Sequence, residues 1–437
     1  MATAAFTLKK EQRKRQRAKG AYLALLIFSA LYFGRPEDVI PGLILIPMAK
    51  ISGGIALVGL ILSLMSGKVK RKFAPETKYV IAMFGWYCIT IPFAYWRGGA
   101  FNTVMNMLSK SVIVAVLVAL LVREFWQLKR LVWVQAAAVA MMTVASVALH
   151  RTSDGRLVGA LGGVFENPND LAINIALNWP ICIAFFFMGR GLKKGLWAFA
   201  VVIMLIGVEL TYSRSGFLAV ALAAVLVVWQ FAIRERKFQL VLVAVFLGMI
   251  VVVAMPSHFT ARIASIVTGN QVDSMDRGSM QERKNLLIAS VNEALHNPIF
   301  GVGAGNFQAT AGSWHVAHNT YTEIAAEAGF PAAVLFLMIL YRTVVNLRLV
   351  RKSRAYATDA EVRMLAGGLW VSVAAYLVSA FFASTEYNLY PYFLVAYTTA
   401  LYQITLTQEE TAASPAPTIG LQSKYGRTGA REPVWIR

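Results

Sequence analysis

The sequence predicts an all-α polytopic membrane protein with about twelve transmembrane helices. Of its 437 residues, 57% are hydrophobic and only 15% are charged, whereas about 25% is usual in soluble domains. The apolar residues gather in stretches suited to cross a hydrocarbon core of ~30 Å as helices. These stretches lie near residues 21–34, 42–65, 79–96, 112–122, 131–149, 171–189, 196–212, 216–233, 238–254, 330–346, 364–384 and 390–406.

The distribution of basic residues predicts the orientation of these helices. The net charge is +20, and 31 of the 42 Lys and Arg residues fall in alternate links, starting with the N-terminal segment. Basic links favour the cytoplasmic side of a membrane, so both termini are predicted to be inside. The positive charge then faces an anionic leaflet. Membrane lipid, rather than nucleic acid, is the predicted partner of these residues.

The chain is predicted to form one transmembrane domain over residues 1–406. The tail 407–437 is rich in Ala, Pro, Ser and Gly and is predicted to be disordered. The longest outside segment is 255–329, and the loop 150–170 and the turn 213–216 lie on the same side. The candidate site residues come from these three outside segments.

The long outer segment contains a predicted surface helix followed by a glycine-rich stretch. In "SMQE", Ser279 is followed three residues later by Glu282, a spacing typical of a capping box. A helix is predicted from there to about His296, and "NPIFGVGAGN" ends it.

A second surface helix is predicted to begin directly after His318. Asn319 or Thr320 can cap its N-terminus, with Glu323 completing a capping box, and the helix would end at Gly329. The positive end of the helix dipole disfavours a protonated imidazole. A neutral imidazole can accept a proton, so His318 is predicted to be a general base.

Three arginines lie in the outside segments. Arg214 occupies the turn "TYSRSG", Arg283 the first surface helix and Arg156 the loop 150–170. Each has a simpler interpretation: Arg214 can extend to water at the membrane boundary, Arg283 can belong to a solvated helix face, and the loop around Arg156 can be a connector. Ionisable residues near a membrane core are nevertheless functional candidates.

Taken together, the four residues predict a site for a lipid-linked diphosphate. Guanidinium groups bind phosphate oxygens with bidentate geometry. Arg156, Arg214 and Arg283 could hold the diphosphate, and Arg214 and Arg283 could stabilise the charge that develops on it as its bond breaks. His318 would remove a proton from an incoming hydroxyl.

No metal or cofactor is predicted. The outside loops lack an Asp-x-Asp pair, because Asp273 and Asp276 are separated by two residues. His315 and His318 lack the nearby glutamate of a zinc-protease motif. The glycines of "GVGAGN" follow no predicted strand, so a turn between two helices is favoured over a nucleotide-binding loop.

Three stretches resemble the hallmark run of bacterial O-antigen ligases and Wzy-type polysaccharide polymerases: "TYSRSG", "RKNLLIASVNEALHNPIFGVGAGNF" and "HNTYTEIAAEAGFP". The resemblance covers roughly residues 160–345. It implies a metal-independent membrane glycosyltransferase with a GT-C-like fold that faces the periplasm. By motif, Arg214 and Arg283 match the diphosphate-binding arginines of the family, and His318 matches its essential histidine. Arg156 is added from its position in the loop.

The resemblance implies an undecaprenyl-diphosphate-linked glycan as donor and a sugar hydroxyl of the lipid A–core as acceptor, in the bacterial inner membrane. The predicted function is therefore O-antigen ligation with inversion at the anomeric carbon. A polymerase that joins two lipid-linked glycans is an alternative. "GRPEDVIPGL" at 34–43 is similar to ligase-like proteins of exosortase systems. A transporter is a more distant alternative. Transporters place polar groups near the bilayer midplane, whereas the predicted spans here are nearly free of central charge and the polar residues gather at the outer edge.

Overall fold

The structure is a computed structural model that describes residues 19–38, 40, 42–43, 46–65, 73–159, 164–233, 274–312 and 315–413. The expected span 238–254 and the loop residues 255–273 lie outside the described residues. The first residues of the predicted disordered tail are helical, because the last helix continues to Ala413. The rest of the tail is outside the described part.

The described residues are almost entirely helical. The helices are Lys19–Gly34, α2 (Met48–Met65), α3 (Pro75–Thr90), α4 (Arg97–Thr103), α5 (Ser109–Leu121), α6 (Phe125–Ala148), α7 (Pro168–Met188), α8 (Leu192–Leu210), α9 (Arg214–Val227), α12 (Ser274–His296), α13 (Phe307–Thr310), α14 (Thr320–Val350), α15 (Arg354–Thr358), α16 (Ala360–Ser379) and α17 (Leu389–Ala413). Short 3-10 turns lie at Pro36–Asp38, Ile91–Phe93 and Val164–Glu166, and π-helical turns at Val104–Leu108 and Val228–Ile233. Two short strands, β1 (Thr152–Ser153) and β2 (Arg156–Leu157), form an antiparallel hairpin.

The architecture confirms an all-α polytopic membrane protein. Within the described residues, seven helices are long and apolar enough to cross a membrane. One of them joins α4 and α5 through the π-helical turn into a span of 25 residues, Arg97–Leu121. The sequence analysis expected a span only at residues 112–122, because the polar residues and glycines of α4 interrupt the apolar pattern at the beginning of the helix.

Helix α7 forms the centre of the bundle. In its most apolar window 83% of the residues are buried, the largest share among the seven spans. One buried polar side chain of α7 bonds to a neighbouring helix, as membrane burial favours: Asn178 accepts a hydrogen bond from Gln135 of α6, and Gln135 accepts one from Tyr397 of α17. The polar groups in the middle of the bundle thus hold helices together.

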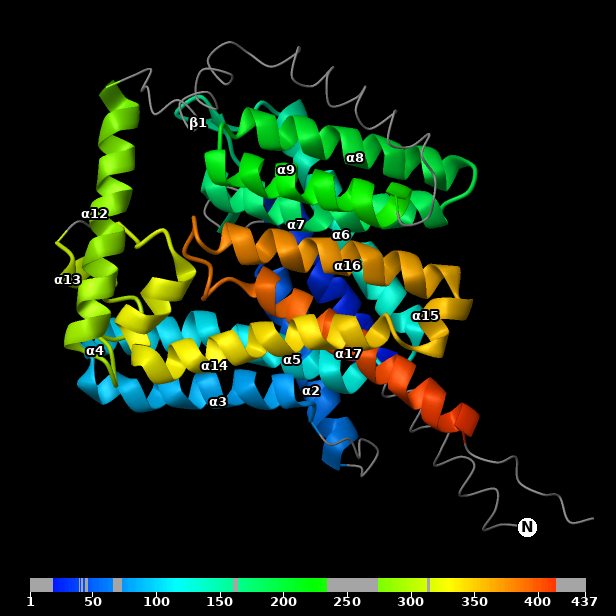
Figure 1. Cartoon of the computed structure of the whole chain (residues 1–437), viewed down its shortest axis with the longest axis horizontal. Helices are drawn as coiled ribbons and strands as arrows, with labels where there is room; N and C mark the ends of the chain where they lie inside the picture. The colour runs from blue at the N-terminus through cyan, green and yellow to red at the C-terminus, as the bar shows by residue number, and fades with distance from the viewer. Residues whose placement is uncertain are drawn as a thin grey trace, which may run out of the picture.

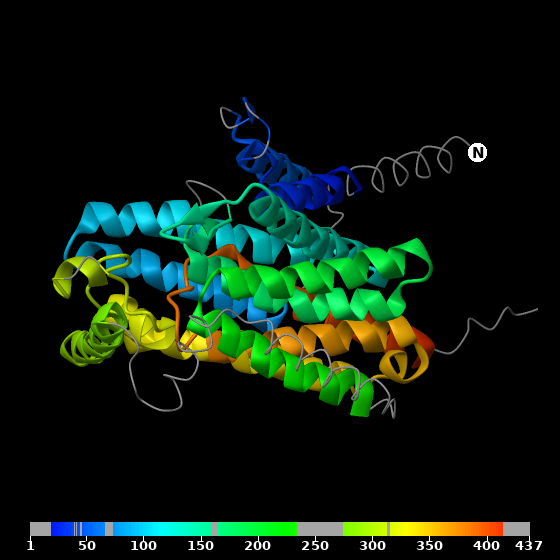
Figure 2. The same cartoon turned by 90° about the horizontal axis from the view of Figure 1, so that it is seen from above.

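The connections between helices gather at two opposite ends of the bundle. One end carries α12, α13, the beginning of α14 and the β1–β2 hairpin, while α15 lies at the other end (Figure 1). The α8–α9 turn lies beside the hairpin, because Arg156 of β2 bonds to that turn. The end with α12 and the hairpin is called the site end below. Helix Lys19–Gly34 and α2 pack against one side of the bundle (Figure 2).

Helix α14 contains a sharp bend at Gly329. This residue has a left-handed backbone (φ 76°), and the helix continues on either side of it. The sequence analysis expected the second surface helix to end here and a separate span to begin. The non-helical Gly329 therefore ends the surface helix, and the apolar helix begins after it, as expected; the label α14 covers both helices across this kink.

Candidate functional site

His318 lies immediately before the N-terminus of α14. The N-cap of this helix is Asn319, whose side chain accepts hydrogen bonds from the backbone N–H groups of Tyr321 (3.0 Å) and Thr322 (3.1 Å). His318 itself has a left-handed backbone, with φ of 53°. Such a conformation costs a non-glycine residue about 1–3 kcal/mol and persists only where neighbouring contacts impose it. The cap and the backbone conformation thus fix the backbone from which the imidazole projects.

Thr320 and Glu323 do not form the expected capping box. The Thr320 hydroxyl donates to the carbonyl of Ala383 (2.6 Å), and the Thr320 N–H donates to the carbonyl of Ala380 (2.8 Å). The Glu323 carboxylate accepts from the N–H of Ala317, 3.1 Å away. These bonds hold Thr320 against the loop that joins α16 to α17, and Ala317 against Glu323 of α14.

The environment of His318 keeps its imidazole neutral. Its pKa is lowered to about 4, first because the ring is largely buried, then because of the positive charge of Arg283 and the proximity of His315. The sequence analysis expected a neutral ring from the helix dipole. The structure identifies burial as the largest cause, which no local pattern could reveal. The ring is available as a proton acceptor throughout the neutral range.

His315 is more exposed than His318 and lies against a different helix. Its side chain is 59% exposed, and its Nε2 lies 3.3 Å from a carboxylate oxygen of Glu282 on α12. It therefore faces the surface of α12 and offers an internal comparison for His318.

Arg283 is carried by α12, which packs along the first part of α14. The Ser290 hydroxyl donates to the Thr322 hydroxyl (2.8 Å), and Leu286 packs in a small cluster with Ala317. The guanidinium is half-buried and acts electrostatically on His318. The helix begins at Ser274 in the described residues, so the expected cap at Ser279 is wrong and that residue lies inside the helix. The predicted end at His296 is confirmed.

Arg156 and Arg214 meet at the α8–α9 turn. The Arg156 guanidinium donates to the carbonyl of Thr211 (2.8 Å) and to the side chain of Asn169 (2.9 Å). The same Asn169 oxygen accepts from the hydroxyl of Ser213 (2.8 Å), which caps α9 directly before Arg214. Arg156 thus fastens the hairpin to the turn that positions Arg214. These two arginines and the turn are called the arginine corner below.

The structure groups the four predicted site residues into two pairs. Arg283 acts on His318, and Arg156 supports the turn of Arg214. Both pairs lie at the site end of the bundle, which carries α12, the start of α14 and the hairpin (Figure 1). The structure thus brings the four residues together as two separate pairs, and their use as one site stays a prediction.

Glu327 is a central residue that the sequence analysis missed. Its carboxylate is 1% exposed and accepts hydrogen bonds from the backbone N–H groups of Gly305 (2.8 Å) and Phe307 (3.1 Å) and from the hydroxyl of Tyr387. It thereby ties the glycine-rich stretch after α12 to α14. The combination of Glu327 with "GVGAGN" was the available signal, because a buried carboxylate needs donors and a glycine-rich loop presents free N–H groups.

Backbone bonds complete this attachment. The N–H groups of Val302 and Gly303 donate to the carbonyls of Ala326 and Glu327, each at 2.8 Å, and the N–H of Phe330 donates to the carbonyl of Pro298 at 2.8 Å. The glycines are therefore used for close backbone packing between the end of α12 and α14. This result supports the predicted turn over a nucleotide-binding loop.

We expect Glu327→Ala to destabilise the protein by ~3–5 kcal/mol, because two backbone N–H groups and a tyrosine hydroxyl would be left buried without an acceptor. Thermal unfolding of the detergent-solubilised protein would measure the loss. Glu293→Ala is the matched control, because Glu293 is a half-buried glutamate of α12 whose carboxylate accepts from Asn297, directly after the end of the same helix. Equal unfolding temperatures for the two variants would contradict the assigned role of Glu327.

Three buried glutamates come together behind the start of α14. The carboxylates of Glu323, Glu327 and Glu386 offer oxygen atoms within 4.8 Å of one another, an arrangement that could hold a cation. The sequence analysis searched only short acidic motifs and so missed this group, since Glu386 comes from the α16–α17 loop. Many of the carboxylate oxygens that could bind a cation already accept hydrogen bonds. Glu323 accepts from a backbone N–H, and Glu327 accepts from three donors.

The site can therefore combine proton transfer with anion binding. A neutral, fixed imidazole can accept a proton, while Arg283 and Arg214 can carry positive charge to a bound phosphate group. Arg156 is held by its bonds to Thr211 and Asn169, and His318 directly precedes a capped helix, which limits the reorganisation needed during a reaction.

Comparison with known proteins gives one family assignment. Residues 199–337 match the family model described as O-Antigen ligase, a range that contains Arg214, Arg283, His318 and Glu327 but not Arg156. No curated protein matches the chain. Among solved structures, a chain from "Structural coordination of polymerization and crosslinking by a peptidoglycan synthase complex" is similar over 78% of this chain and 98% of its own, with 15% sequence identity and a TM-score of 0.43.

Proposed function

We propose that the chain is a glycan ligase of the bacterial inner membrane, because its residues 199–337 match the O-antigen ligase family model. It would transfer an undecaprenyl-diphosphate-linked glycan to a sugar hydroxyl of the lipid A–core. A GT-C-like arrangement of helices and a periplasmic site end are part of this proposal. The observation that supports it best is the neutral His318 beside Arg283 at one end of a polytopic bundle.

The proposed reaction is a single displacement at the anomeric carbon of the donor. His318 accepts the proton of the acceptor hydroxyl as the acceptor oxygen forms its bond to that carbon. The bond between the carbon and the diphosphate oxygen breaks, and the electron pair leaves with the lipid diphosphate. Attack from the opposite face inverts the configuration. Arg283 and Arg214 stabilise the growing negative charge of the leaving group.

The cellular test is the surface glycan of a strain that lacks this protein. A ligase predicts the loss of long glycan from the lipid A–core together with accumulation of lipid-linked polymer. A polymerase instead predicts that single glycan units still reach the lipid A–core, because ligation continues without chain growth. A normal glycan profile would contradict both functions.

Arg214→Lys is expected to lower transfer about tenfold, because lysine keeps the charge but cannot present two parallel N–H groups to phosphate. The rate of glycan transfer by purified protein at a fixed donor concentration would measure the effect. Arg190→Lys, at an exposed position in the α7–α8 link, is the control and should match the unaltered protein. An equal rate for both variants would remove Arg214 from the diphosphate site.

Transfer is expected to continue after exhaustive treatment with EDTA, because arginines supply the charge that a metal would otherwise provide. The buried glutamate group makes this measurement informative. Elemental analysis of the purified protein should accompany the assay, since a cation held by Glu323, Glu327 and Glu386 would be shielded from chelator. Stoichiometric metal, or activity that returns only with Mg²⁺ or Mn²⁺, would show that the proposed mechanism is incomplete.

A further inference from the structure

Two helices begin side by side at the arginine corner. Helix α7 begins at Pro168 and α9 begins at Arg214. A Cβ atom on Gly216 would come within 2.3 Å of the Cβ atom of Ala172, so a glycine at this position lets the two helices approach closely. The positive ends of both helix dipoles therefore lie at the corner together with its two arginines, and this arrangement favours a bound anion.

Asn169, the second residue of α7, joins the two segments that carry the arginines. Its side-chain oxygen accepts from the guanidinium of Arg156 (2.9 Å) and from the hydroxyl of Ser213 (2.8 Å). Its backbone N–H donates to the side chain of Asn167, 2.8 Å away. The residue is half-buried, so it is held within the corner and can still be reached from outside.

The bonding partners of Asn169 fix the direction of its amide. A guanidinium has N–H donors and no acceptor, so the Asn169 atom that faces Arg156 is the oxygen rather than the NH2 group. Because that oxygen only accepts, the Ser213 hydroxyl must donate to it, while the Ser213 oxygen accepts from the backbone N–H of Gly216 (3.2 Å). The NH2 group is thus turned away from both donors. Within the part of the chain that the structure describes, it donates to no acceptor.

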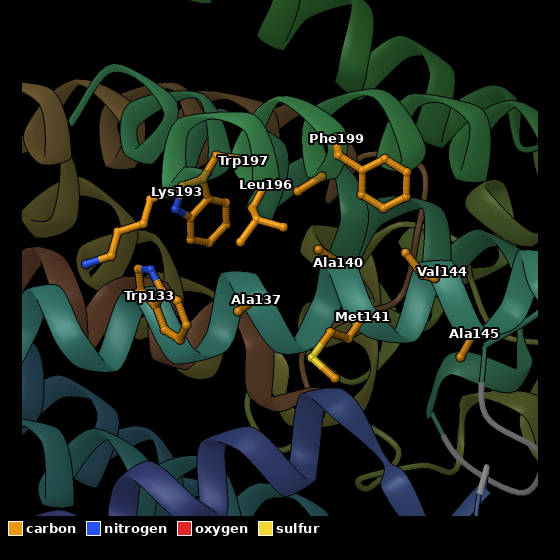
Figure 3. A pocket seen from close by; sticks show the side chains of 11 residues that line it. Trp133, Ala137, Ala140, Met141, Val144, Ala145, Lys193, Leu196, Trp197 and Phe199 are labelled. Atoms are coloured by element: carbon orange, nitrogen blue, oxygen red, sulfur yellow. The ribbon is translucent and has the colours of Figure 1, made fainter. Parts of the chain in front are cut away.

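The apolar groove between α6 and α8 is a separate feature. It has a volume of about 490 Å³, and Trp133, Met141 and Phe199 are among its lining side chains (Figure 3). Of the described residues that line it, Lys193 is the one with a charge, and none belongs to the arginine corner. The groove therefore does not offer an alternative site for a doubly charged group, whereas the corner combines guanidinium and amide donors.

We propose that the side-chain NH2 group of Asn169 donates to a phosphate oxygen of the donor diphosphate at the arginine corner. This assignment rests on the proposed function, because it adds a third donor to the proposed diphosphate site. The guanidinium groups supply charge, whereas the amide supplies a neutral donor in a fixed direction, so it selects the position of the phosphate. A hydrogen bond to a charged group should strengthen donor binding by about tenfold to hundredfold.

The first test is Asn169→Asp, which keeps the shape of the side chain and its acceptor for Arg156 and Ser213 but replaces the NH2 group with oxygen. Equilibrium binding of radiolabelled undecaprenyl diphosphate to the solubilised protein should weaken about tenfold to hundredfold. The unfolding temperature should not fall, since both existing bonds can persist. If Asn169 only held Arg156 in place, the carboxylate would hold it at least as well. Unchanged binding would therefore overturn the proposal.

Asn167→Asp is the matched control. It adds the same charge two residues earlier, at the exposed N-cap of α7, where aspartate caps as well as asparagine. Binding should change by no more than about twofold, because an exposed charge is screened. The loss in Asn169→Asp should persist at high salt, since a missing hydrogen bond is not restored by screening. Equal effects of the two variants, or a loss that disappears at high salt, would overturn the proposal.

A second background separates the amide from its neighbour. In an Arg156→Ala protein the Asn169→Asp change should weaken binding further. No further loss would mean that the new carboxylate acts only by neutralising Arg156, and this result would overturn the proposal.

Competition identifies the source of the phosphate, because phospholipid headgroups also carry phosphate oxygens. Excess unlabelled undecaprenyl diphosphate should displace the label, and vesicles of phosphatidylglycerol at the same concentration should not. Displacement by phosphatidylglycerol would indicate a general site for lipid phosphate and overturn the proposal. Saturable binding that is weakened by Asn169→Asp, in a protein that transfers no glycan, would retain the role of Asn169 and contradict only the ligase function.

Discussion

His318→Ala is expected to reduce glycan transfer by about 10²–10⁴-fold, the contribution typical of a general base. The physical reason is that the imidazole is held neutral at a fixed backbone position, with its pKa lowered to about 4. Donor binding should persist, because both arginines of the mechanism remain. The transfer rate and the binding of labelled donor should be measured on the same preparation, together with its folded yield.

His315→Ala is the matched control for this prediction. It removes a neighbouring histidine that is exposed and lies against Glu282, so transfer should stay close to that of the unaltered protein. If both variants lost activity to the same extent, the special role of His318 would be contradicted. If His318→Ala lost folded protein rather than activity, the histidine would have a structural role at the start of α14.

Arg283→Ala is expected to lower kcat by about 10²–10³-fold, because the leaving diphosphate would lose a charged donor. The variant has a second expected signature. Since the charge of Arg283 helps to lower the pKa of His318, its removal should raise that pKa. Neutral imidazole would then be lost at a higher pH as the solution is acidified. The acid limb of the rate–pH profile should therefore move upward from about pH 4.

Lys284→Ala gives the comparison for Arg283, because it removes a positive charge from an exposed neighbouring position of α12. It should alter neither kcat nor the acid limb. A loss of rate in Arg283→Ala without a shift of the limb would retain the contact with the leaving group but separate Arg283 from the imidazole. Identical profiles for the two variants would exclude both roles.

The fold class was predictable because apolar length and basic links depend on local composition. The end of α12 and the Asn319 cap were also predictable, since each follows from a short motif. The start of α12 was not, because Ser279 satisfies the capping pattern inside a longer helix. The span that contains α4 was likewise predicted too short, because a local pattern of apolar residues does not include the polar start of that helix.

The site was only partly predictable for a related reason. Its four residues stood out as ionisable groups in outside segments, but their pairing depends on tertiary contacts. The bond from Arg156 to Thr211 joins residues 55 positions apart, and Glu386 lies 59 positions after Glu327. The burial that keeps His318 neutral likewise arises from packing among distant segments. No spacing rule within one segment contains that information.

The bend at Gly329 has a consequence for how this sequence can vary. An L-residue there would need both an unfavourable backbone angle and space that is absent, because its Cβ would lie 2.0 Å from the carbonyl oxygen of Ile299. Gly312 has a similar angle, φ of 65°, but nothing within 4 Å of the corresponding position. Asparagine, which tolerates this angle, could therefore replace Gly312. At Gly329 both the backbone angle and the lack of space exclude any side chain, so we expect every substitution at this position to be disfavoured.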